Sequence, residues 1–185
     1  MLDALRKELK IEQRAGFPFV FGGACLASLI CLVYYLPLSL SLQNMLTLCL
    51  SPLILVFALI MGRYLQLNIL DRTHPLSSLG LYLSINQMLY LLIVLISCNA
   101  YPQAMLLFYV IIHAGHYWPF AWLYKVKAYA YMSVAMTLLS LPIRLFFNNQ
   151  GLALFLMTTS WLFVLVLWQE YKNQQPRSQY EADLP

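Results

Sequence analysis

Long uncharged apolar stretches alternate along this chain with short polar or charged segments. Six of the stretches approach the roughly 20 residues that an α-helix needs to cross a bilayer core. They cover residues 17–36, 42–61, 79–98, 102–123, 128–143 and 152–168. The pattern predicts an all-α protein, a polytopic membrane helical bundle with six transmembrane helices.

The segments that flank the predicted spans are polar. Residues 1–16 carry leucines at helical spacing, and Asp3 stands four residues before Lys7. This arrangement is typical of an amphipathic helix that lies on a membrane surface. Residues 169–185 form a polar tail that we expect to be disordered. The predicted organisation is therefore an N-terminal segment, a six-helix domain over residues 17–168 and a tail.

The lysine and arginine residues predict the orientation of the bundle. Of the eleven, all but Arg144 fall in the N-terminal segment, in the loops after the second and fourth spans, or in the tail. Loops retained in the cytoplasm are enriched in these residues, so this side is predicted to be cytoplasmic. Both termini then lie in the cytoplasm, as an even number of spans requires.

Composition narrows the class of protein further. Hydrophobic residues make up 62% of the chain and charged residues 10%, whereas about a quarter of an average soluble domain is charged. A soluble globular domain is therefore excluded. The net charge of +4 comes from basic residues beside apolar spans, which points to the lipid bilayer as partner and not to nucleic acid.

Polar side chains inside apolar spans need explanation, because hydrocarbon offers them no hydrogen-bonding partner. They gather in the third and fourth spans, at Asn86, Gln87, Tyr90, Tyr109, His113, His116 and Tyr117. The loop between these spans is short, which predicts antiparallel neighbours. Asn86 and His116 each lie fifteen residues from Tyr101 in that loop, so they should share one depth. The sequence thus predicts a polar ligand-binding pocket between the two spans, open to the cytoplasm.

His116 is the expected principal polar contact or proton carrier of this pocket, with Asn86 and Gln87 as partners. His113 lies about one turn deeper, where a charged imidazole would be poorly solvated, so we expect a neutral packing role. Two histidines without carboxylate or thiolate ligands leave a metal site incomplete, so neither a metal nor another cofactor is expected. The alternative stays open that these groups only hold two helices in register by hydrogen bonds.

A second set of residues is predicted to line the cytoplasmic mouth of the pocket. The set comprises Asp71, Arg72 and His74 before the third span, and Trp122, Tyr124 and Lys125 at the end of the fourth. Solvated loop charges and an interfacial belt of aromatic and snorkelling basic residues explain the same positions without a pocket.

Two stretches carry a family resemblance. They are HPLSSLGLYLSINQMLY over residues 74–90 and AGHYWPFAWLYKVKAY over residues 114–129. They resemble an uncharacterised family of small bacterial inner-membrane proteins with about six helices. The matching positions are Pro75, Leu76, Gly80, Asn86, Gln87, His116, Trp122, Tyr124 and Lys125. The resemblance implies a location in the bacterial inner membrane and supplies no activity.

The expected function is small-molecule or ion transport, or ligand binding, through the predicted pocket. The alternative is a non-catalytic accessory or assembly subunit of a membrane complex, because the sequence holds no complete catalytic set. Gly23, Ala27 and Cys31 form a small-residue stripe on the first span that would let another helix approach, within the bundle or in a homo-oligomer. A lipid-modifying membrane enzyme is a third class, although a non-enzymatic function is favoured.

Overall fold

The computed structural model describes residues 1–69 and 74–182, except for the side chains of residues 81, 87, 88 and 173–182. All regular elements among these residues are helical, which confirms the predicted all-α class. The α-helices are α1 (Leu2–Glu12), α2 (Phe17–Tyr35), α3 (Leu40–Leu50), α4 (Leu53–Tyr64), α5 (Ser77–Ala100), α6 (Met105–Tyr124) and α7 (Lys127–Ala182). Short 3₁₀ turns, Arg14–Gly16 and Pro102–Ala104, precede α2 and α6.

Several of these helices are long and apolar enough to cross a membrane. Within the described residues, four segments meet this condition: Arg14–Tyr35, Ser77–Ala100, Pro102–Tyr124 and Lys127–Lys172. The pair α3 and α4, bent by 40° at its break, would make a fifth if it forms one span. The fold is therefore a bundle of apolar helices, as the hydropathy pattern predicts.

The break between α3 and α4 lies at Pro52, the residue before α4. Proline has no N–H to continue the helical ladder. Around Pro52 the backbone hydrogen bonds join residues three apart instead of four. The Ser51 amide donates to the Leu48 carbonyl at 3.2 Å, and the Ile54 amide donates to the Ser51 carbonyl at 3.3 Å. The Ser51 hydroxyl also donates to the Thr47 carbonyl at 2.8 Å, a contact that helps to bend helices.

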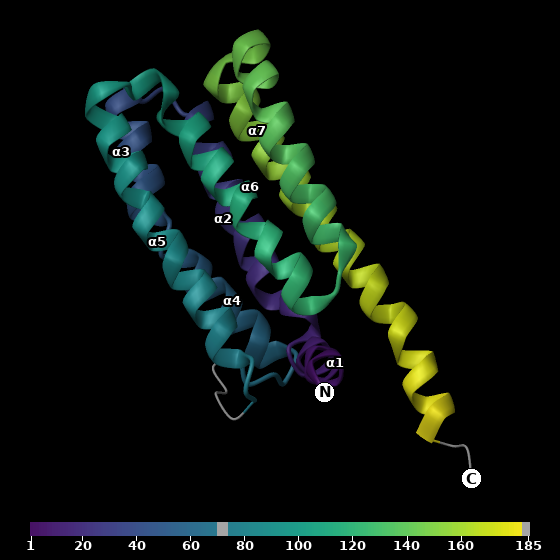
Figure 1. Cartoon of the computed structure of the whole chain (residues 1–185). Helices are drawn as coiled ribbons and strands as arrows, with labels where there is room; N and C mark the ends of the chain where they lie inside the picture. The colour runs from purple at the N-terminus through teal and green to yellow at the C-terminus, as the bar shows by residue number, and fades with distance from the viewer. Residues whose placement is uncertain (70–73, 183–185) are drawn as a thin grey trace.

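Helix α7 reverses direction along its length. Asn148 has non-helical backbone angles, φ 59° and ψ −163°. On one side of it, the Tyr129 hydroxyl donates to the Ala15 carbonyl at 2.7 Å, and on the other side the Trp168 ring lies 5.4 Å from that of Phe17. Tyr129 and Trp168, on opposite sides of the reversal, therefore both lie near the start of α2, and Figure 1 shows the first half of α7 rising and its second half returning alongside.

The polar tail predicted to be disordered begins instead as part of α7, which continues past Trp168 to Ala182. An ion pair between Lys10 and Glu170, 2.9 Å from Nζ to Oε1, ties this part of the helix to α1. The sequence argument failed here because polar composition does not prevent a helix from extending when its first turn is fixed by another element.

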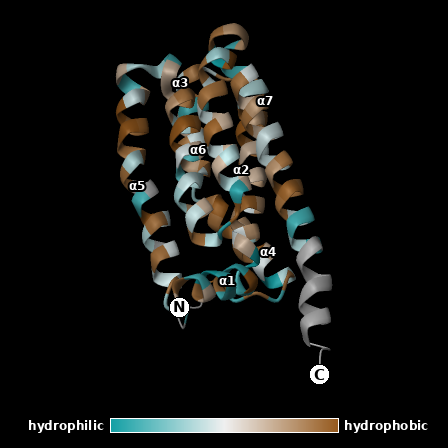
Figure 2. Cartoon of the chain, turned by 45° about the vertical axis from the view of Figure 1, so that its right-hand side comes forward, coloured by the Kyte–Doolittle hydropathy of each residue, from teal (hydrophilic) through white to brown (hydrophobic). Residues whose placement is uncertain are grey.

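The bundle has two unlike ends. One holds α1, the end of α4 and the end of α7, and the other holds the α5–α6 connection and the reversal of α7 (Figure 1). Helix α1 lies across its end of the bundle (Figure 2), with Leu9 and Arg6 buried against other elements. At the opposite end, the Arg144 guanidinium donates to the Gln103 carbonyl at 3.0 Å.

Helix α2 lies deepest in the bundle. A Cβ atom at Gly22 would stand 2.6 Å from the Ile54 carbonyl oxygen, so the backbones of α2 and α4 meet here. The stripe formed by Gly23, Ala27 and Cys31 is buried as well. These small residues therefore serve packing inside the bundle, one of the two roles that their spacing predicts.

Candidate functional site

The inward face of α6 carries three buried polar aromatic residues. Tyr109, His113 and Tyr117 stand four residues apart and so share one side of the helix. This side faces α2 at Gly23, where an added Cβ atom would lie 3.7 Å from His113 Cε1 and 3.8 Å from the Tyr117 hydroxyl. The glycine leaves room for the two polar side chains between the helices.

These residues form a line of contacts that reaches the break in the α3–α4 pair. The Tyr117 hydroxyl lies 2.8 Å from His113 Nε2, and the His113 and Tyr109 rings stack with centroids 6.3 Å apart. The hydroxyls of Tyr109 and Ser51 are 3.3 Å apart. We call Ser51, Tyr109, His113 and Tyr117 the polar seam. It offers an imidazole and three hydroxyls, which can donate and accept hydrogen bonds and exchange protons.

The residues expected to pair between the third and fourth spans do not pair. Asn86 is exposed, and its Nδ2 atom donates to the Tyr90 hydroxyl at 3.4 Å on the same helix. His116 is half-buried, and its ring packs against Phe120 with centroids 4.9 Å apart. Helix α5 does lie beside α6, but the side that it buries contains Val94 rather than Asn86. The side chain of Gln87 lies outside the described residues.

Of the expected mouth residues before α5, the structure describes His74 alone. Asp71 and Arg72 lie outside the described residues. His74 is buried, and its Nδ1 atom accepts a hydrogen bond from the Leu76 amide at 3.2 Å. Its Nε2 atom lies 3.8 Å from Glu8 Oε2. His74 is thus turned toward α1 and its own backbone.

The expected mouth residues at the end of α6 gather against α1 and the turn after it. The Trp122 ring lies under the Arg6 guanidinium, 4.4 Å from its carbon, and Arg6 also donates to the Trp122 carbonyl. The Tyr124 hydroxyl donates to Gln13 Oε1 at 2.8 Å. These contacts close this end of the bundle with the N-terminal segment.

An ion pair completes this closure. Lys125 Nζ lies 2.7 Å from Asp3 Oδ1, and the Arg6 guanidinium lies 3.4 Å from the same atom. The hydrogen bond from Lys125, its charge and that of Arg6 hold the pKa of Asp3 below its ordinary value. Asp3 therefore pairs across helices and not with Lys7, its neighbour at i+4.

Sequence reasoning missed Ser51 and Gln13. A signal existed for Ser51, since it directly precedes a proline inside an apolar stretch, but nothing local indicated that it meets Tyr109. Gln13 showed no signal, because its partner stands 111 positions away. Among the residues that the structure describes, no three His, Cys, Asp or Glu side chains gather in a way that could hold a metal ion.

Together these observations define an all-helical protein with several apolar helices long enough to cross a membrane and a polar seam beside a broken helix. The chain belongs to the family of unknown function DUF7010, whose family model matches residues 2–170. This confirms the expected membership of an uncharacterised family. No curated protein and no solved structure matches the chain.

Proposed function

We propose that the protein spans the bacterial inner membrane six times, with both termini in the cytoplasm. The six crossings would be α2, the α3–α4 pair, α5, α6 and the two halves of α7. The bend at Pro52 and the reversal at Asn148 support this count. The basic residues of α1 and the Lys125 region lie at one end of the bundle, while Arg144 lies at the other, which supports the orientation.

Within this bundle, the proposed function is binding and transport of a small polar solute or ion at the polar seam. The contact that carries the proposal is the one between Ser51, at the break of a span, and Tyr109 on the inward face of α6. Discontinuous helices in membrane transporters place polar backbone and side-chain groups near the middle of the bilayer. Ser51 stands eleven residues after Leu40, about 17 Å along the helix axis, which is near that middle.

The seam thus replaces the pocket expected between the third and fourth spans as the favoured binding site. The sequence predicts His116 as the principal polar contact or proton carrier. We propose that His113, with Tyr117 beside it, has this role instead. Gly23 supports this choice, because a larger residue there would crowd both side chains. If the break served only helix packing, apolar side chains on the inward face of α6 would suffice. The Tyr109 hydroxyl and the His113 imidazole on that face therefore support a binding role.

The test is the accessibility of the seam to water. A variant without the four native cysteines receives Ser51→Cys, or Ser160→Cys as control. Ser51 is half-buried at the break, whereas Ser160 is buried in α7 away from it. Both are treated in oriented vesicles with a charged, membrane-impermeant thiol reagent. We expect Cys at position 51 to react from at least one side and Cys at position 160 not to react. Failure of both to react would show a closed seam and reject the transport proposal.

A second candidate function is an accessory or assembly subunit of a membrane complex, and α5 favours it. Only 7% of the apolar window of α5 is buried inside the bundle, against 67% for Arg14–Tyr35. The Asn86 carboxamide is exposed on this helix, where lipid would give it no partner. Asparagine at such a position promotes association with another transmembrane helix through hydrogen bonds.

Co-purification in mild detergent separates the two candidates. If α5 meets a partner, the wild type should carry a stoichiometric second subunit, or a second copy, that Asn86→Leu loses. Asn99→Leu is the matched control, because it makes the same change near the end of α5. A monomeric wild type without a partner would reject the subunit candidate and leave the transport proposal in place.

A further inference from the structure

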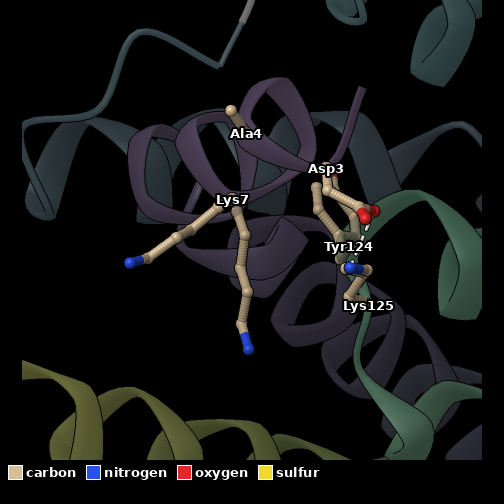
Figure 3. Close-up of a pocket in the computed structure, with 6 residues that line it drawn as sticks. Asp3, Ala4, Lys7, Tyr124 and Lys125 are labelled. Atoms are coloured by element: carbon tan, nitrogen blue, oxygen red, sulfur yellow. Dashed lines mark ion pairs between the residues drawn. The ribbon is translucent and has the colours of Figure 1, made fainter. Parts of the chain in front are cut away.

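A basic cavity lies between α1 and the end of α6, apart from the polar seam. Its volume is about 440 Å³, and it is lined by Asp3, Ala4, Lys7, Lys10, Tyr124 and Lys125. Figure 3 shows Asp3 and Lys125 joined by their ion pair on one side of this cavity, with Lys7 extending away from them. The lining contains three lysines and one carboxylate, and Glu170 pairs with Lys10 from outside the lining, so one positive charge stays in excess. The hollow is large enough for a small ligand.

The three lysines differ in how far other groups neutralise them. Lys125 is paired with Asp3 and Lys10 with Glu170. Lys7 forms no ion pair with any residue that the structure describes, and it is exposed. Because Asp3 binds Lys125 across helices, it does not form an ion pair with Lys7, four residues further along α1. The fold therefore keeps one lysine ammonium, with its three hydrogen-bond donors, available at the cavity.

The walls of the cavity suit an anion that also has an uncharged part. Tyr124, whose hydroxyl is already bound to Gln13, contributes an aromatic side chain to the lining. Ala4 is small and leaves space beside Lys7. The first turn of α1 also contributes the positive end of the helix dipole, which favours negative charge. Trp122 lies exposed close by, as aromatic residues do at the level of lipid headgroups.

We infer that this cavity binds a phosphate-bearing anion, through Lys7 first and Lys10 and Lys125 in support. The ligand chemistry is a phosphate ester, which can come from an anionic phospholipid headgroup at the membrane surface or from a free phosphate compound in solution. The site shares no residue with the polar seam, so either proposal can fail without the other.

The experiment measures the thermal unfolding midpoint of the full chain in neutral detergent micelles. One arm adds short-chain phosphatidylglycerol, and the other adds glycerol 1-phosphate. Sodium chloride of matched ionic strength is the reference, and phosphatidylcholine is the neutral lipid reference. We expect the midpoint to rise with the anionic compounds only. Lys7→Gln should weaken the apparent affinity about fivefold, the contribution of one lysine near an anionic surface.

Lys127→Gln is the matched control, because Lys127 is exposed at the same end of the bundle and lies outside the cavity lining. A rise with phosphatidylglycerol alone assigns the site to a lipid headgroup, and a rise with both compounds assigns it to phosphate as such. Two outcomes overturn the inference: no rise beyond that given by matched salt, or equal weakening by Lys7→Gln and Lys127→Gln, which would indicate general surface charge.

Discussion

The Tyr117 hydroxyl lies 2.8 Å from the Nε2 atom of His113, one turn away on the same buried face of α6. The pair satisfies two polar groups that would otherwise be costly in an apolar interior. The Tyr117 ring in turn packs edge-on against Phe163 of α7, with centroids 5.0 Å apart. The pair therefore links the polar seam to the second half of α7.

We predict that His113 contributes more than His116 to the stability of the fold. His113→Ala removes a buried ring and leaves the Tyr117 hydroxyl unpaired, a loss of about 1–3 kcal/mol in the free energy of unfolding. His116→Ala removes a half-buried ring whose described contact is with Phe120, so it should cost less. Unfolding of both variants in one detergent tests the order. A larger loss for His116→Ala would contradict it.

Counting residues from a loop gives depth along a helix but not the direction in which a side chain points. The count therefore set Asn86 and His116 at one level, yet Asn86 lies on an exposed side of α5. Rotation about a helix axis depends on the packing of all neighbours, which no local pattern encodes. The limits of one helix agree with its apolar stretch: the sequence predicts a span over residues 17–36, and α2 covers Phe17–Tyr35.

The closure of the bundle by α1 could not be predicted for a related reason. A charged residue near one end of the chain has many possible partners, and the ion pair of Asp3 with Lys125 spans 122 positions. By contrast, the break at Pro52 follows from the chemistry of one residue, so its position was predictable from the sequence. Its contact with Tyr109, through Ser51, again required the fold.

Gly22 should tolerate no side chain. The Cβ atom of Gly22→Ala would lie 2.6 Å from the Ile54 carbonyl oxygen and 3.1 Å from the Ala58 amide nitrogen, and both belong to backbone that cannot rotate away. Helices α2 and α4 must then separate, at a cost of about 1–3 kcal/mol. Gly115→Ala is the control, because nothing lies within 4 Å of its added Cβ atom. Thermal midpoints that fall equally for both variants would disprove the close approach.

The ion pair of Asp3 with Lys125 should weaken in acid. Since Lys125 lowers the pKa of Asp3 in the folded chain, the unfolded chain binds the proton more readily. The stabilisation is therefore fully present above the ordinary pKa of aspartate, about 3.9, and is lost as the pH falls through the lowered value. Asp3→Asn should be less stable than wild type at neutral pH, and the difference should vanish in acid.

Stability of wild type and Asp3→Asn from pH 2 to 7 measures this effect. Glu12→Gln makes the same charge change on α1, and Glu12 has no ion pair among the residues described, so it should match wild type at neutral pH. A difference between wild type and Asp3→Asn that stays constant down to pH 2 would show that the carboxylate charge is not its source.

The proposed topology predicts where reporters become active. Alkaline phosphatase, which needs the periplasm, should be inactive when fused after Pro185 and active when inserted near Asn99 or Asn148. Green fluorescent protein should give the opposite pattern. The reason is the side on which basic residues gather, since Arg144 lies close to the reversal at Asn148, whereas Lys125 lies against α1 at the far end. Active phosphatase both near Asn148 and after Pro185 would place the two ends of the second half of α7 on one side, so this half would not span the membrane.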